Sequence, residues 1–172
     1  MKEIAIVIPA WNEASTIGNN LSEINRCIKD IEATKFSLLV IDDGSEDGTA
    51  EIVRKISSEA DIAVSLICLS RHFGKEAAIL AGLEHSQDYD AVIVMDSDLQ
   101  HPPALIEDMV RNWLSGFQIV EGVKSSRGNE SLMKNILVRS YYRIFSFFTG
   151  LSIEGESDFK LLDSAVVSAY CD

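Results

Sequence analysis

Acidic residues gather in three short runs, and each run follows a stretch of apolar residues. The runs are PAWNE at 9–13, DDGSEDGT at 42–49 and DSDLQHPP at 96–103. If the apolar stretches are parallel strands, the three runs meet at one edge of a sheet. Carboxylates brought together there repel one another unless a cation or a set of hydrogen-bond donors lies between them. The sequence therefore predicts a ligand-binding site at this edge.

The most specific chemistry is indicated by an Asp-x-Asp pair, Asp96 and Asp98, with Gln100 two residues further on. Oxygen ligands at this spacing suit Mg²⁺ or Mn²⁺, which keeps some water ligands and bridges the phosphates of a substrate. A diphosphate needs such a cation to approach the carboxylates, and the cation also stabilises a departing nucleoside diphosphate. Asp-x-Asp is common in solvated turns too. Its place after an apolar strand, beside two other acidic turns, favours the metal site.

The run at 42–49 has two kinds of residue in it. Glycine, serine and aspartate are ordinary turn formers, and we interpret Ser45 and Asp47 as caps of the helix that follows. We interpret Asp43 as a contact to a base or a ribose. In the first acidic run, Trp11 either stacks on a nucleobase or covers the edge of the sheet, and the residues alone leave both open.

Two familiar cofactor motifs are absent from the sequence. No G-x-G-x-x-G follows the first apolar stretch, and there is no G-x-x-x-x-G-K-[ST], so neither a dinucleotide dehydrogenase nor a P-loop protein is favoured. The segment HFGK at 72–75 places Gly74 at an expected helix start, where a glycine is consistent with a simple turn.

The elements that must position these residues alternate between strand and helix. The apolar stretches are continuous, which is typical of strands covered on both faces, and the segments between them have helical spacing. Such alternation predicts an α/β fold with a largely parallel sheet and right-handed crossovers. We expect strands at 3–8, 36–41, 62–69, 91–95 and 117–122, and helices at 14–31, 48–59, 75–86, 103–115 and 131–148.

Size and charge narrow the class of protein. With 172 residues, 47% of them hydrophobic, the chain suits one domain with its own core. Three widely spaced cysteines indicate reduced thiols and an intracellular chain, and no apolar stretch reaches the length of a membrane span.

The net charge of -12 disfavours nucleic acid as a partner. Residues 124–143 differ, with five basic residues and one acidic residue, which indicates an anion site.

At this point the chain resembles family 2 glycosyltransferases, and within them the dolichyl- or polyprenyl-phosphate sugar synthase branch. The resemblance rests on five motifs that occur in order along nearly the whole chain. They are VIPAWNE, VIDDGSEDGT, LSRHFGKEAAILAGLEHS, VIVMDSDLQHPPALIEDMV and SDFKLLD. The resemblance implies a GT-A fold, a nucleotide-diphosphate sugar as donor and Mg²⁺ or Mn²⁺ as cofactor.

The resemblance also implies roles for individual residues. Residues 1–123 are expected to form the nucleotide-sugar and metal-binding core, and residues 124–172 the acceptor side of the same domain. Asp96, Asp98, Arg127 and Asp158 are the expected catalytic residues. The expected nucleotide-sugar contacts are Pro9, Trp11, Glu13, Ile41, Asp43, Met95, Asp96, Ser97 and Asp98; the metal ligands are Asp96, Asp98 and Gln100; and the acceptor-phosphate clamps are Lys124, Arg127 and Lys160.

The sequence departs from the family pattern at several positions. Trp11 stands where Tyr is usual, His72 where Asn is usual, and Lys124, Lys160 and Ser164 where Arg is usual. Lysine keeps the charge of arginine and loses its bidentate geometry. Members of the branch continue beyond this length, commonly into membrane helices. We therefore expect a soluble chain truncated from a protein that works on the cytoplasmic side of a membrane.

The predicted reaction is an inverting transfer of the sugar to a polyprenyl phosphate, with a UDP-sugar the preferred donor and GDP-mannose the alternative. The phosphate is anionic near neutral pH, so it needs positioning and charge neutralisation more than a strong base. Asp158 would orient the cations, or act as base toward a hydroxyl acceptor.

The basic, aromatic helix expected at 131–148 either meets a membrane surface or packs on the core. Two other functions remain open: a glycosyltransferase acting on a hydroxyl acceptor, and a non-catalytic nucleotide-binding domain.

Overall fold

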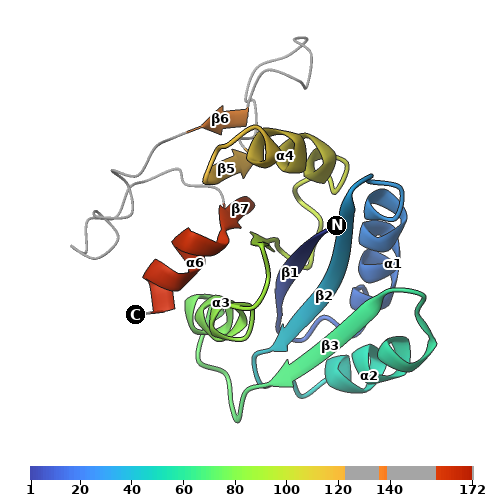
Figure 1. Ribbon diagram of the computed structural model, residues 1–172. Coiled ribbons are helices and arrows are strands. Elements are labelled where there is room, and N and C mark those ends of the chain that lie inside the picture. Colours follow the sequence, from blue (N-terminus) through green and yellow to red (C-terminus); the bar gives the residue numbers. More distant parts are fainter. Residues whose placement is uncertain (123–135, 139–157, 172) are drawn as a thin grey trace, which may run out of the picture.

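The computed structural model describes residues 1–122, 136–138 and 158–171. These residues form one seven-stranded sheet in the order β3-β2-β1-β4-β7-β5-β6 (Figure 1). The four strands from β3 to β4 are parallel neighbours, whereas β7 is antiparallel to both β4 and β5, and β6 is antiparallel to β5. The strands are β1 Lys2–Ala10, β2 Thr34–Asp42, β3 Ala63–Cys68, β4 Ala91–Val94, β5 Ile119–Gly122, β6 Ile136–Val138 and β7 Lys160–Asp163.

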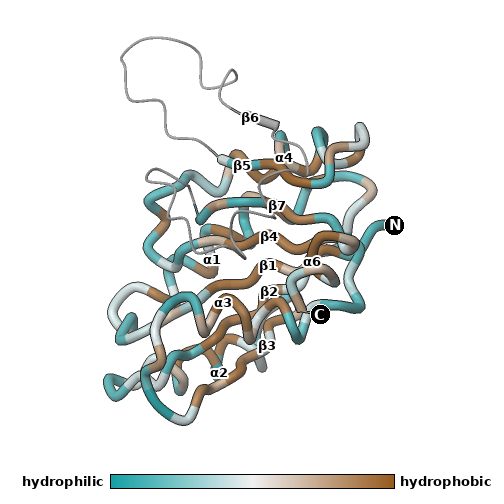
Figure 2. The backbone as a smooth tube through the Cα atoms, turned by 90° about the vertical axis from the view of Figure 1, so that its left-hand side faces the viewer, coloured by the Kyte–Doolittle hydropathy of each residue, from teal (hydrophilic) through white to brown (hydrophobic). Residues whose placement is uncertain are grey.

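Helices cover both faces of the sheet, which explains why the central strands are apolar without alternation. On β1, Ile4, Ile6 and Ile8 pack into the core beneath α1, α2 and α4, while Ala5 and Val7 face α3 and α6. Figure 2 shows the central strands as hydrophobic along most of their length. The helices are α1 Ile17–Ile28, α2 Thr49–Glu59, α3 Lys75–Glu84, α4 Leu105–Leu114 and α6 Ser164–Cys171.

The α/β fold with a mostly parallel sheet is confirmed, and each of the first five strands and first four helices overlaps its predicted range. The prediction of a helix over 131–148 is wrong where the structure describes it, because Ile136–Val138 forms a strand antiparallel to β5. A run of Ile, Leu and Val suits a pleated strand, and pairing satisfies the backbone groups at the exposed edge of β5. The other residues of that range lie outside the described part of the chain.

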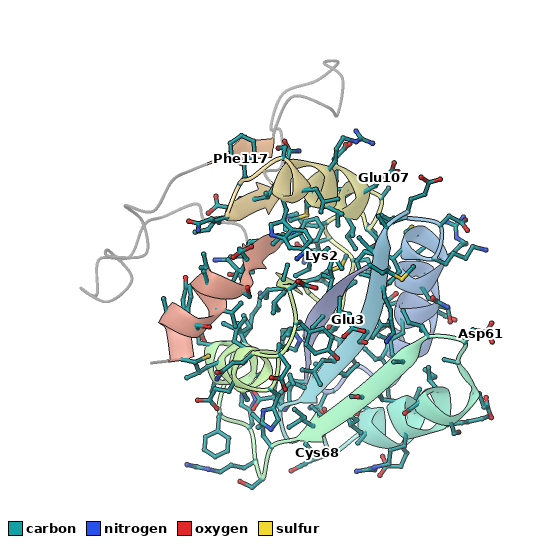
Figure 3. The ribbon with its side chains drawn as sticks, in the orientation of Figure 1. Lys2, Glu3, Asp61, Cys68, Glu107 and Phe117 are labelled. Atoms are coloured by element: carbon teal, nitrogen blue, oxygen red, sulfur yellow. The ribbon has the colours of Figure 1, made fainter. Side chains whose placement is uncertain are left out.

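The register of the strands decides which side chains meet at the carboxyl edge of the sheet. Ala10 pairs with Asp42, and Asp42 with Cys68, so β1, β2 and β3 end at one level. The N–H of Met95 continues the ladder by donating to the carbonyl of Val7, 3.0 Å away. Cys68 is labelled in Figure 3 at this end of β3, and Asp61 lies near the opposite end. The residues that follow β1, β2 and β4 therefore share one edge.

Helix α3 approaches the sheet closely at a glycine. A Cβ placed on Gly82 would overlap Val7 Cγ1 and lie 3.3 Å from Ile41 Cγ1. The absence of a side chain lets the helix lie directly on β1 and β2, which carry the acidic turns at their ends. Within the described residues, no helix combines the length and apolar character needed to cross a membrane.

We expect Gly82→Ala to lower the free energy of unfolding by about 1–3 kcal/mol, because the added methyl overpacks the interface between α3 and β1. Gly18→Ala is the matched control, since a Cβ there lies in ordinary contact, 3.7 Å from Ile52 and Ile56. In helix α1 this change should raise stability by up to about 1 kcal/mol. Urea denaturation followed by circular dichroism measures both, and equal effects of the two substitutions would contradict this packing.

Candidate functional site

A cavity of about 360 Å³ lies at the carboxyl edge of the sheet. The turns after β1, β2 and β4 and the start of α3 supply its walls. Ligands of open α/β sheets bind in this position, beyond the strand ends. Eight residues predicted from the sequence line it: Pro9, Trp11, Glu13, Asp43, Asp96, Ser97, Asp98 and Gln100; it is also lined by Ala10, His72, Lys75 and Ala78.

A lysine connects two of the predicted catalytic carboxylates. Lys75 Nζ lies 2.6 Å from Asp96 Oδ1 and 2.6 Å from Asp158 Oδ2. Partial burial by itself lowers the pKa of the Lys75 ammonium, but its hydrogen bonds with Asp158 and Asp96 and their charges outweigh this, so the pKa lies above its ordinary value. Lys75 therefore remains charged at neutral pH and neutralises part of the acidic edge.

Asp98 and Gln100 form a small closed turn. The backbone N–H of Gln100 donates to Asp98 Oδ1 at 3.0 Å, and Gln100 Nε2 lies 2.6 Å from Asp98 Oδ2. Leu99 between them has a φ of 55°, in the left-handed region. This turn holds the Asp98 carboxylate at the cavity beside Asp96.

The carboxylates of Asp96 and Asp98 are hard oxygen donors of the kind that Mg²⁺ and Mn²⁺ prefer. In the described part of the chain, no three His, Cys, Asp or Glu side chains are grouped so as to hold a metal ion. Two carboxylates suit an ion such as Mg²⁺, which usually keeps several waters and is bound through one or two carboxylates and substrate phosphates.

Asp43 organises the loop that leads into α3. Its buried carboxylate accepts hydrogen bonds from the backbone N–H groups of Phe73 at 2.8 Å and Gly74 at 2.9 Å, and His72 Nδ1 lies 2.8 Å from Asp43 Oδ2. The His72 ring in turn stacks on Trp11, with centroids 4.1 Å apart. Trp11 is 49% exposed, so a flat aromatic surface remains at the cavity mouth.

The turns after β1 and β2 brace each other through side chains that accept backbone hydrogen bonds. Ser45 Oγ accepts from the N–H of Asn12 at 2.8 Å, and Asp47 Oδ2 accepts from the N–H of Ala14 at 2.9 Å. The prediction of a helix cap is therefore wrong for Ser45 and incomplete for Asp47. Gly48 occupies the cap position of α2, and Asp47 holds the first turn through Thr49 while it bridges to the other loop.

The remaining predicted residues lie elsewhere. Ile41 and Met95 are fully buried in the core, so their side chains do not line the cavity. Asp158 and Lys160 border a separate, mainly apolar cleft of about 290 Å³ between α3, β7 and α6. Lys124 and Arg127 lie outside the described residues.

Two polar residues of the site received no role from the sequence. Lys75 and His72 both belong to the segment HFGK, in which we singled out Gly74 as a turn residue. A basic residue and an imidazole directly after an expected strand were the available signal. Their partners are distant in the sequence, since Lys75 and Asp158 are 83 positions apart.

Comparison with known proteins agrees with this geometry. Residues 5–160 match the model of the family described as Glycosyl transferase family 2. The chain belongs to glycosyltransferase family 2. This confirms the resemblance expected from the five motifs, and it places the cavity in the part of the chain that the family model covers.

Among curated family 2 relatives, the chain is 34% identical over 165 residues to the uncharacterized glycosyltransferase YkcC of Bacillus subtilis, covering 95% of this chain and 50% of that protein. It is 34% identical over 135 residues to the undecaprenyl-phosphate 4-deoxy-4-formamido-L-arabinose transferase of Salmonella choleraesuis, covering 78% of this chain and 41% of that protein. The chain thus spans half or less of the length of these relatives.

Among solved structures, the chain resembles the mannosyltransferase PcManGT of Pyrobaculum calidifontis in complex with GDP-Man and Mn²⁺. The TM-score is 0.61 at 26% identity, covering 71% of this chain and 35% of that one. The fold of this family 2 chain is accordingly GT-A.

We expect Asp43→Ala to lower the free energy of unfolding by about 1–3 kcal/mol, because it leaves the N–H groups of Phe73 and Gly74 without their acceptor. Asp43→Asn should cost less, since one oxygen remains as an acceptor. Asp88→Ala, at an exposed position, is the control. Urea denaturation measures all three, and a stability of Asp43→Ala equal to that of Asp88→Ala would show that Asp43 does not hold this loop.

Proposed function

We propose that this chain is the donor-binding part of a glycosyltransferase that moves a sugar from a nucleoside diphosphate to an acceptor. The supporting observation is the cavity in which Asp96, Asp98 and Lys75 lie together beyond the ends of parallel strands. Carboxylates beside an ammonium suit a ligand that carries both metal-binding oxygens and negative charge. A pyrophosphate linked to a sugar has this character.

In the proposed complex, Asp96 and Asp98 hold Mg²⁺ or Mn²⁺, with the Gln100 side chain beside them. An ion held there would supply positive charge to the departing diphosphate. Relatives support this role, because PcManGT was solved with GDP-Man and Mn²⁺. Ser97 is a proposed donor contact that lines the cavity, and its backbone is held there because its carbonyl accepts a hydrogen bond from Asn20 Nδ2 at 2.6 Å.

The proposed nucleoside site is the end of the cavity formed by Pro9, Trp11, Glu13 and Asp43. The exposed Trp11 ring, supported by His72, offers a stacking surface for a base. Asp43 acts there mainly by shaping the loop that carries His72. Ile41 and Met95 support the site from the core. The preferred donor is a UDP-sugar, and GDP-mannose is the alternative.

The proposed acceptor is a polyprenyl phosphate presented at the cytoplasmic surface of a membrane. Its support is the similarity to a transferase that is named for undecaprenyl phosphate. The acceptor oxygen attacks the anomeric carbon as the nucleoside diphosphate leaves, which inverts the configuration. Arg127, Lys124 and Lys160 are the proposed phosphate clamps, and Asp158 orients the cations.

We expect Asp98→Ala to reduce transfer on the order of a hundredfold or more, because the ion that neutralises the leaving group loses a ligand. Asp88→Ala should leave transfer unchanged. Release of nucleoside diphosphate from a labelled donor measures the rate, with and without excess chelator. Full activity in chelator would remove the metal from the reaction.

We expect undecaprenyl phosphate to accept sugar at least about tenfold faster than simple saccharides, because the bound phosphate is already anionic. Transfer of radiolabelled sugar from UDP-glucose, UDP-N-acetylglucosamine and GDP-mannose to each acceptor is the assay. The full-length protein is the one to use, since the relatives are about twice as long. Faster transfer to a saccharide would favour a hydroxyl acceptor, and binding of donor without any transfer would favour a non-catalytic domain.

A further inference from the structure

The Lys75 ammonium pairs with Asp96, a carboxylate that the proposed function assigns to a divalent ion. The ammonium lies 2.6 Å from Asp96 Oδ1, on the turn after β4, and 2.6 Å from Asp158 Oδ2, just before β7. The lysine is the first residue of α3 and follows Gly74, whose φ is 105°. One side chain thus ties together three segments that are far apart in the sequence.

The Lys75 ammonium and a divalent ion would repel each other if both bound the Asp96 carboxylate. Two cations within a few ångströms repel each other strongly unless additional negative charge lies between them. A diphosphate supplies that charge, because its oxygens accept both a metal and an ammonium. The apo site therefore favours the lysine, and the nucleotide-loaded site accommodates the lysine and the metal together.

This arrangement is not required for packing of the helix. The side chains of Lys75, Asp96 and Asp158 are 38%, 25% and 46% exposed, so the triad is in contact with solvent. Helix α3 is anchored further along by Ala78, Gly82 and Leu83. Removal of the ammonium should change the electrostatics of the site and leave the fold in place.

We propose that Lys75 is a positioning residue that keeps Asp96 from binding a divalent ion until a nucleoside diphosphate is present. Metal and nucleotide then bind with positive coupling, and Lys75 remains beside Asp158 to face the diphosphate. This inference rests on the proposed function, because it takes Asp96 as a metal ligand. It adds a binding order and assigns the residue that imposes it.

The test is Mn²⁺ titration followed by electron paramagnetic resonance, first with Mn²⁺ alone and then with saturating UDP or GDP. Lys75→Met should bind Mn²⁺ about tenfold more tightly than the wild type in the absence of nucleotide, and it should lose most of the tightening that nucleotide produces. Lys75→Arg should restore wild-type behaviour, because it returns the charge. Lys75→Gln serves as a second neutral variant.

Lys35→Met is the matched control, since Lys35 forms a similarly short ion pair with Glu3 on the surface, and its Mn²⁺ affinity should equal that of the wild type. Thermal melts establish that each variant is folded. Equal Mn²⁺ affinity of wild type, Lys75→Met and Lys75→Gln, with nucleotide still tightening Mn²⁺ binding to the wild type, would overturn this inference alone. Absence of Mn²⁺ binding by every chain, with either nucleotide, would overturn the metal role and this inference with it.

Discussion

Mutual repulsion among carboxylates at one edge of the sheet is the constraint to which the surrounding structure responds. Parallel strands β1 and β2 end level with each other at Ala10 and Asp42, β4 ends opposite Val7 of β1, and an acidic turn follows each of the three. Three of these carboxylates have donors of different kinds: backbone N–H groups for Asp43, Gln100 for Asp98 and the Lys75 ammonium for Asp96. These donors reduce the repulsion among the three carboxylates.

The donors of Asp43 and Asp96 depend on close contact between the loops after β2 and β3. Gly44 has a φ of 71°, and a Cβ on it would lie 2.6 Å from the backbone nitrogen of His72. Glycine therefore lets the loop that carries His72 and Lys75 lie against the turn after β2. From there the loop returns to the cavity and starts α3. A side chain at this position would displace the donors of both Asp43 and Asp96.

The sequence predicted the parts of the fold that local pattern determines. Continuous apolar runs located β1 to β5, because burial on both faces of a parallel sheet leaves little choice of residue. β7 and α6 were not predicted, since Lys160–Asp163 is short and its pairing with β4 and β5 is a tertiary event. The acidic residues of the cavity were predicted from their place after strands. The role of Lys75 was not, because its carboxylate partners come from other turns.

The charge balance of the cavity supports the proposed metal site, because the lysine in the cavity does not balance the carboxylates by itself. Glu13, Asp43, Asp96 and Asp98 line the described cavity with one ammonium, that of Lys75. Lys75 also contacts Asp158, so its charge is shared between two carboxylates. The diphosphate of the proposed donor would add further negative charge to these carboxylates, and one shared ammonium cannot offset it. In the proposed complex, a divalent ion held by Asp96 and Asp98 would supply the missing positive charge, and Lys75 would determine when that ion binds.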